Sequence, residues 1–177
     1  MAEALPAVRD LLAARDFSDE PQVRSLVDAA LARFGDSVQA IVLYGSFTRG
    51  ARDTLLDLYI LLDSLDSLPA WQRVFGRMLA PNVYQLVTEE SRAKVAVMTF
   101  EALEKGVRSD ITPYFWARFA QPCALVYSGS DSIPDRFTRL MTSAAERLVA
   151  AAAVDGAGAY ESRQFWEHTF ALTYGAE

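Results

Sequence analysis

The sequence predicts an α/β domain followed by a smaller helical module, and two observations lead to that prediction. Apolar, β-branched segments of strand length alternate along the chain with segments of helical periodicity. A turn-rich link at 128–134, Ser-Gly-Ser-Asp-Ser-Ile-Pro, then separates the last predicted strand from an alanine-rich helical region. The predicted units are therefore residues 1–127 and residues 128–177.

The individual elements follow in order from hydrophobic periodicity and from turn residues. Two amphipathic helices are expected first, at 6–14 and 21–34, and Gly35 ends the second in the manner of a C-cap. Strands are predicted at 38–44, 55–62, 82–88, 93–99 and 123–127. Further helices are predicted at 68–79, 100–106, 113–119, 134–153 and 162–173.

The turn after the first predicted strand carries the strongest functional signal. Gly45 and Ser46 end the apolar run 38–44 sharply, and a glycine there lets the backbone approach a ligand closely. The serine hydroxyl and the following amides are suited to anionic oxygens, as in other phosphate-binding turns. Asp57 stands in the next apolar run, where an ionised carboxylate is unfavourable unless it is paired or bound to a cation. We therefore expect a divalent metal ion between Asp57 and a triphosphate, because hard cations prefer carboxylate and phosphate oxygens.

This layout resembles the nucleotidyltransferase superfamily, whose pattern is Gly-Ser, a further glycine, and an Asp-x-Asp pair opening the next strand. Gly45 and Ser46 take the Gly-Ser positions, and Gly50 takes the later glycine. Asp57 takes the first metal-binding aspartate, whereas Tyr59 stands where the second belongs. Two carboxylates normally help to hold two Mg²⁺ ions in such sites, so Tyr59 is the main departure. The resemblance implies a mixed, mainly antiparallel sheet with helices on one side.

One branch of the superfamily shares the single aspartate. The segment 56–63 is similar to that of the mitochondrial-type CDP-diacylglycerol synthases, the translocator assembly and maintenance family, in which a second Asp follows at the position of Asp63. Blocks that resemble family segments occur in the same order at 44–46, around Trp71, and at 80–84, 94–97, 114–122 and 165–177. The matching C-terminal module of the family is a winged helix, and the family continues past the position of Glu177. We therefore expect 128–177 to be winged-helix-like and shortened at its C-terminus.

The family resemblance implies a Mg²⁺-dependent phosphatidate cytidylyltransferase, which makes CDP-diacylglycerol and pyrophosphate from CTP and phosphatidate. The attacking phosphate is already ionised at neutral pH, so the reaction needs charge neutralisation and in-line positioning more than a strong base. The expected catalytic residues are Asp57, which is also the metal ligand, Lys94 and Arg118. The expected nucleotide-binding residues are Tyr44, Gly45, Ser46 and Gly50.

Composition narrows the classes of function. A net charge of −6 argues against a nucleic-acid binder, which would carry a basic stripe. The one cysteine, Cys123, allows no internal disulfide and is expected to be a buried apolar residue. No long uninterrupted apolar run and no basic leader are visible, so we expect a cytoplasmic protein that meets a membrane lipid peripherally. The sequence leaves the oligomeric state open.

Two other functions fit parts of the sequence. A nucleotidyltransferase with a small acceptor, such as an aminoglycoside, would normally show Asp-x-Asp and a third carboxylate. A nucleotide-binding protein without catalysis is favoured by Tyr59. Several residues also have a purely structural interpretation. Arg49 and Arg52 could be solvated loop charges, and Lys94 and Arg118 could form salt bridges to Glu89 or Glu90. Tyr114 and Trp116 could pack in the core rather than form the wall of a pocket.

Overall fold

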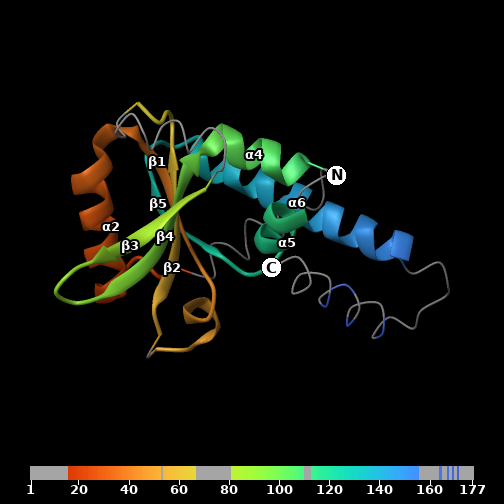
Figure 1. Ribbon diagram of the computed structural model, residues 1–177, viewed down its shortest axis with the longest axis horizontal. Helices are drawn as coiled ribbons and strands as arrows, with labels where there is room; N and C mark the ends of the chain where they lie inside the picture. Colours follow the sequence, from red (N-terminus) through yellow and green to blue (C-terminus); the bar gives the residue numbers. More distant parts are fainter. Residues whose placement is uncertain are drawn as a thin grey trace.

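A five-stranded sheet lies between helices, and Figure 1 shows it nearly edge-on. The computed structural model describes residues 16–52, 54–66, 81–109 and 113–155, together with Gln164, Glu167, Thr169 and Ala171. The predicted helices 6–14 and 68–79 lie outside the described residues, as does most of 162–173. Within the described part the protein is a mixed α/β structure, which confirms the predicted class.

The strand order in the sheet is β3-β4-β2-β1-β5. Strand β1 (Val38–Tyr44) pairs antiparallel with β2 (Leu56–Leu62) and with β5 (Ala124–Ser128). Strand β3 (Asn82–Val87) pairs antiparallel with β4 (Arg92–Thr99), and β2 pairs parallel with β4. The sheet is therefore mixed and mainly antiparallel, as expected.

The helix ends follow from local chemistry. Helix α2 (Pro21–Phe34) begins with a proline in its first turn and ends at Gly35, whose φ of 60° suits glycine and whose N–H donates to the Leu31 carbonyl. Helix α4 (Phe100–Arg108) begins after Thr99, whose hydroxyl accepts a hydrogen bond from the Ala102 N–H at 3.1 Å. Helices α5 (Pro113–Phe119) and α6 (Ile133–Asp155) follow along the chain.

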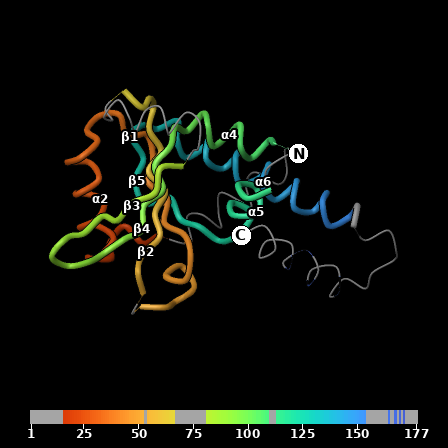
Figure 2. The backbone as a smooth tube through the Cα atoms, in the orientation of Figure 1, coloured from red at the N-terminus to blue at the C-terminus, as the bar shows by residue number. Residues whose placement is uncertain are grey.

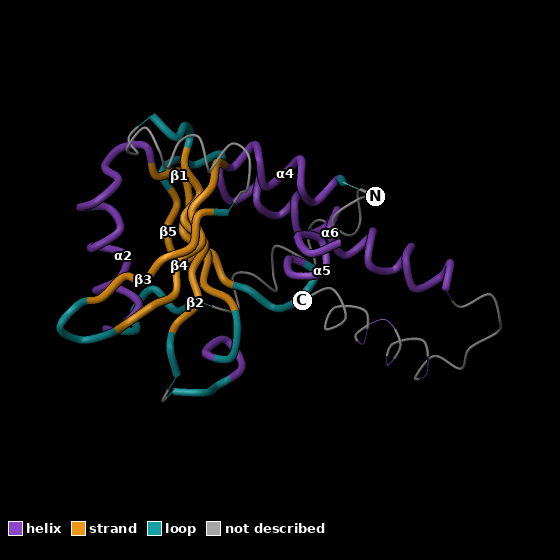
Figure 3. Tube along the Cα trace, viewed as in Figure 1, coloured by secondary structure: helices purple, strands orange, loops and turns teal. Residues whose placement is uncertain are grey.

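Helices cover both faces of the sheet, so the expectation of helices on one side is wrong. Helix α2 packs on one face, called here the α2 face, and α4, α5 and α6 pack on the other, the α4–α6 face (Figure 3). The reason lies in β1 and β2, which are apolar at almost every position and therefore need cover on both sides.

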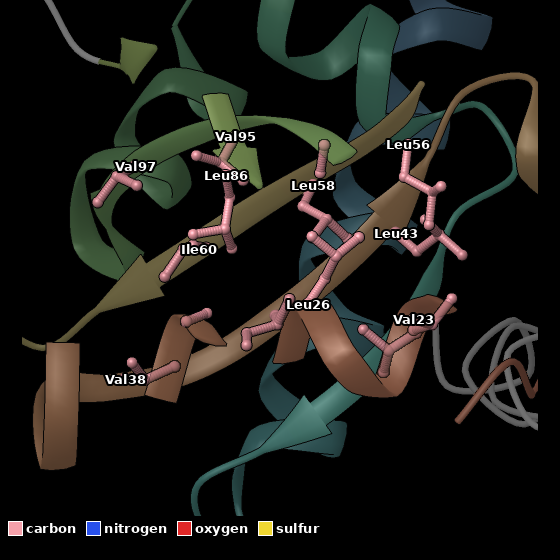
Figure 4. Close-up of a cluster of buried hydrophobic side chains, with 14 of the residues drawn as sticks. Val23, Leu26, Val38, Leu43, Leu56, Leu58, Ile60, Leu86, Val95 and Val97 are labelled. Atoms are coloured by element: carbon pink, nitrogen blue, oxygen red, sulfur yellow. The ribbon is translucent and has the colours of Figure 1, made fainter. Parts of the chain in front are cut away.

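The core on the α2 face is mostly aliphatic. Figure 4 shows valine, leucine and isoleucine side chains of the sheet packed against Val23 and Leu26 of α2. Burying each such side chain contributes about 1.5–3 kcal/mol. This face therefore holds α2 to the sheet through apolar contact.

Helix α6 begins in the region predicted as a separate module, and its first half packs on the sheet. Ile133, Phe137, Leu140 and Ala144 share a buried cluster with residues of β1 and β2. Arg136 also donates to both carboxylate oxygens of Glu104 on α4, at 2.8 and 2.9 Å. Figure 2 shows α6 beside α4 and α5 and then continuing beyond the sheet. The domain boundary and the winged-helix character of 128–177 stay predictions.

Among the described helices, none combines the length and the apolar character that crossing a bilayer requires.

Candidate functional site

Three of the predicted site residues stand side by side across the sheet. The strand register pairs Tyr44 of β1 with Asp57 of β2, and Asp57 with Lys94 of β4. Directly paired residues on neighbouring strands share a face, so all three lie on the α4–α6 face. This row is at the end of the sheet where β1 ends and β2 begins, and Gln85 of β3 continues it.

The carboxylate of Asp57 lies against the glycine turn. Gly45 has a φ of +83°, a conformation that side-chain-bearing residues rarely adopt. A Cβ at Gly45 would also come within 2.5 Å of Asp57 Oδ2. Glycine is therefore required twice here, once for the backbone angle and once for the close approach of the carboxylate. The structure therefore places the Asp57 carboxylate beside the Gly45 turn, whereas the metal ion expected there stays a prediction.

The rest of the turn is closed by its own hydrogen bonds. The Ser46 and Thr54 hydroxyls are 3.0 Å apart, and the Thr48 hydroxyl donates to the Gly45 carbonyl at 2.8 Å. Gly50 ends the short 3₁₀ helix η2 (Phe47–Arg49) with a φ of +98°, and a Cβ there would meet nothing within 4 Å. Gly50 thus shapes the turn, whereas Gly45 contacts the site. Thr54 carries no sequence signal that would have identified it.

Arg118 reaches the same region from α5. Its guanidinium carbon lies 5.0 Å from the ring centre of Tyr44 and 5.4 Å from that of Tyr114. A cation on an aromatic face is stabilised by about 0.5–2 kcal/mol, depending on how far it is desolvated. Tyr114, one of two residues considered as a pocket wall, therefore holds the arginine instead of packing only as core.

Tyr59, which stands where the superfamily resemblance expects a second carboxylate, is fully buried. Its ring centre lies 5.0 Å from those of Tyr44 and Phe119, and its hydroxyl donates a long hydrogen bond of 3.4 Å to the Tyr114 hydroxyl. Burial, followed by the contact with Tyr114, raises the pKa of Tyr59 far above its ordinary value, so the phenol stays neutral. A neutral, buried phenol is a poor metal ligand. Within the described residues, no group of three or more His, Cys, Asp or Glu side chains could hold a metal ion.

A divalent cation is nevertheless compatible with Asp57. Its carboxylate is half-buried at the turn and supplies the hard oxygen donor that Mg²⁺ prefers. Mg²⁺ commonly takes one or two carboxylates and completes its coordination with water and substrate phosphates. The donor set therefore fits a cation that Asp57 shares with a phosphate ligand.

Lys94 is exposed beside Asp57. Its strand alternates, so Ala93 and Val95 are buried while Lys94 points to the open part of the α4–α6 face. Within the described residues it forms no ion pair with Glu89 or Glu90. On the same face of the edge strand β3, Val83 and Val87 are 51% and 60% exposed.

Other residues considered from sequence lie elsewhere. Arg52 pairs with Glu20 at 3.3 Å, stacks on Phe47 and lines a polar pocket of about 320 Å³ at the sheet rim. Arg49 is exposed. Cys123 is buried, with its Sγ 3.8 Å from the Met141 Sδ, which confirms the structural reading of that thiol.

Four predicted site residues therefore lie close together: Tyr44, Asp57 and Lys94 in the row, and Arg118 beside it. No model of a known protein family matches the chain, and a search of curated proteins finds no matching sequence. The family resemblance stays a prediction, and the functional proposal depends on the site geometry together with the sequence motifs.

Proposed function

We propose that this protein is a phosphatidate cytidylyltransferase, which transfers the cytidylyl group of CTP to phosphatidate. The observation that carries the proposal is the contact between the Asp57 carboxylate and the Gly45 turn, beside Lys94. A carboxylate, a tight glycine turn and neighbouring cations are the groups needed to bind a metal-complexed triphosphate. CTP as the nucleotide and phosphatidate as the acceptor come from the family resemblance.

The proposal assigns a role to each residue of the site. Gly45 and Ser46 receive the phosphates, Asp57 holds Mg²⁺, and Lys94 and Arg118 neutralise phosphate charge. Mg²⁺ held by Asp57 would further neutralise the charge on the triphosphate. A phosphatidate oxygen attacks the α-phosphorus, the bond from that phosphorus to the bridging oxygen of the β-phosphate breaks, and pyrophosphate leaves. The attacking oxygen is already deprotonated, so no side chain has to take a proton.

A lipid acceptor is supported by the exposed part of the α4–α6 face. Val83 and Val87 leave apolar surface next to the exposed cation Lys94, and this surface adjoins the row that contains Asp57. A phosphomonoester head group near Lys94 and acyl chains along the two valines would satisfy both kinds of surface. The protein would then meet the bilayer peripherally from the aqueous side.

A nucleotide-binding protein without catalysis is the second candidate, because the row of Tyr44, Asp57 and Lys94 contains one carboxylate and the next residue on its face, Tyr59, is a buried phenol. The two candidates agree on nucleotide binding and differ on turnover. CTP bound without any formation of CDP-diacylglycerol would favour the second.

The deciding experiment combines product detection with ligand-induced stabilisation. Vesicles of phosphatidate in phosphatidylcholine are incubated with CTP and Mg²⁺, and CDP-diacylglycerol is measured by mass spectrometry. CTP at about 100 times its Kd should stabilise the fold by about 2.7 kcal/mol, and ATP and GTP should stabilise it less. Equal stabilisation by all three nucleotides would rule out a cytidylyltransferase.

Asp57→Asn is the matched site variant, with Asp63→Asn as its control just beyond the end of the same strand. Asp63 is exposed just after the end of β2, so its loss removes the same charge outside the site. Asp57→Asn should abolish product and the Mg²⁺-dependent part of the stabilisation, and Asp63→Asn should leave both. Equal behaviour of the two variants would remove Asp57 from the site.

A further inference from the structure

Among the residues that the structure describes, the row of Tyr44, Asp57, Lys94 and Gln85 holds one carboxylate, which is fewer than a pair of divalent cations requires. Asp57 is the carboxylate of the row, and Tyr59, the next residue on the same face, is a buried phenol. A nucleoside triphosphate carries several negative charges, and two-metal sites neutralise them with two cations held by shared carboxylates. With one carboxylate, the remaining charge has to be met by another group.

Arg118 is positioned to be that group. Its guanidinium is half-buried and lies against the rings of Tyr44 and Tyr114. Tyr44 is the register neighbour of Asp57 on the same face, so the arginine and the carboxylate belong to one neighbourhood. Stacking uses the flat face of a guanidinium, whereas its N–H donors lie in its plane and match phosphate oxygens in pairs.

Lys94 is less suited to neutralising the remaining charge of the triphosphate. It is exposed on a flexible four-carbon stem, and it would lose side-chain freedom on binding a phosphate. Arg118 is already restrained by two rings, so less freedom remains to be lost.

We propose that this site uses one divalent cation, held by Asp57, and that Arg118 supplies the positive charge that a second cation provides in sites with two carboxylates. The proposal rests on the nucleotide site proposed above. Tyr59 contacts both residues that hold the arginine, through the ring of Tyr44 and the hydroxyl of Tyr114. Tyr59 is therefore a positioning residue that acts through Arg118.

The number of cations per bound nucleotide is the first test. The protein is saturated with a non-hydrolysable CTP analogue, and bound Mn²⁺ is counted by electron paramagnetic resonance and by equilibrium dialysis. We expect one Mn²⁺ per bound nucleotide. Two Mn²⁺ per nucleotide would overturn this inference and leave the proposed function standing, whereas failure of the analogue to bind would overturn the nucleotide site itself.

Arg118→Gln is the second test, with Arg139→Gln as the control. Arg139 is an exposed arginine of α6, and its substitution makes the same change in net charge. Arg118→Gln should weaken binding of the analogue by roughly 10- to 100-fold, as expected for loss of charge-assisted hydrogen bonds, and should keep one Mn²⁺ per bound nucleotide. Arg139→Gln should change neither quantity. Equal affinity in both variants would overturn the role of Arg118.

The third test addresses Tyr59. Tyr59→Phe keeps the ring against Tyr44 and Phe119 and removes only the hydroxyl that reaches Tyr114. We expect a severalfold loss of nucleotide affinity when Arg118 is present and no further loss in the Arg118→Gln background. An equal effect in both backgrounds, or no effect in either, would overturn the positioning role, because a residue acting through Arg118 depends on it.

Discussion

Toward α2, strand β2 presents Leu56, Leu58 and Ile60 to an aliphatic core, as Figure 4 shows. Toward α4, α5 and α6, the same strand presents Asp57 and Tyr59 to a glycine turn, aromatic rings and an arginine. Alternate residues of β2 therefore have different roles. The α2 face contributes stability, and the end of the α4–α6 face carries the proposed chemistry. Substitutions one position apart should separate the two properties.

The largest expected effect comes from a single added methyl group at the turn. In Gly45→Ala the added methyl group would lie 2.5 Å from Asp57 Oδ2, so the Asp57 carboxylate has to move away. In the control, Gly35→Ala, the added methyl group meets no atom within 4 Å. Both variants place alanine at a positive φ, so both should lose about 1–2 kcal/mol of stability. Formation of CDP-diacylglycerol per folded molecule should fall about 100-fold for Gly45→Ala and stay unchanged for Gly35→Ala. Similar activity in the two variants would break the link between the turn and the carboxylate.

The α2 face should show the opposite pattern. Leu58→Ala removes a fully buried side chain, so the free energy of unfolding should fall by about 2–5 kcal/mol in urea titrations. CTP affinity measured on the folded protein should stay near that of the wild type. Leu55→Ala, at an exposed position just before the strand, should have little effect on stability. A large loss of CTP affinity in folded Leu58→Ala would show that the two faces are not separable.

An ion pair between helices gives a smaller, pH-dependent effect. The Arg136 guanidinium, by its hydrogen bonds, holds the pKa of Glu104 below its ordinary value of 4.5. A lowered folded pKa means that the pair stabilises the protein above pH 4.5 and that this contribution is lost as the pH falls through the folded value. Glu104→Gln should therefore lower the free energy of unfolding by about 1–3 kcal/mol at pH 7 and by progressively less in acid. A difference between wild type and variant that does not shrink below pH 4.5 would contradict this assignment.

Substitution of an exposed valine on β3 should change stability least and still lower turnover on phosphatidate vesicles. Val87→Ser changes an exposed residue of β3, and the free energy of unfolding should change by no more than about 0.5 kcal/mol. Turnover on phosphatidate vesicles should fall severalfold while CTP affinity stays constant. Val149→Ser makes the same change at an exposed position of α6 and should leave turnover unaltered. Loss of turnover in both variants would remove β3 from the proposed lipid contact.

The sequence predicted the elements well because their signals are local. Periodicity and turn residues located the described strands and helices to within about two residues, which is the usual uncertainty of such boundaries. The proximity of Gly45 and Asp57 likewise depends on a local pairing, since β1 and β2 are consecutive antiparallel strands. Cover on both faces was missed, although the nearly continuous apolar runs of β1 and β2 were available to indicate it.

The remaining site contacts depend on pairings that no local pattern contains. Lys94 lies beside Asp57 only because β2 and β4 pair in parallel, and its exposure follows from its place on the open part of the face. The contacts of Arg118 with Tyr44 join segments far apart in the chain. The Arg136–Glu104 ion pair could not be predicted from the sequence, because each residue alone has the pattern of an exposed charge on a helix.

The order of the strands also bears on how the protein folds. Strands β1 and β2 pair and are consecutive in the sequence. Strands β1 and β5 also pair and lie side by side in Figure 1, although β2, β3 and β4 lie between them in the sequence. Pairings between distant segments form slowly because loop closure has to precede their contacts. Tyr44 and Asp57 should therefore meet early in folding, while Lys94 and Arg118 join them only after β4 and α5 have docked. Nucleotide binding followed during refolding would then report the last assembled part of the molecule rather than the first.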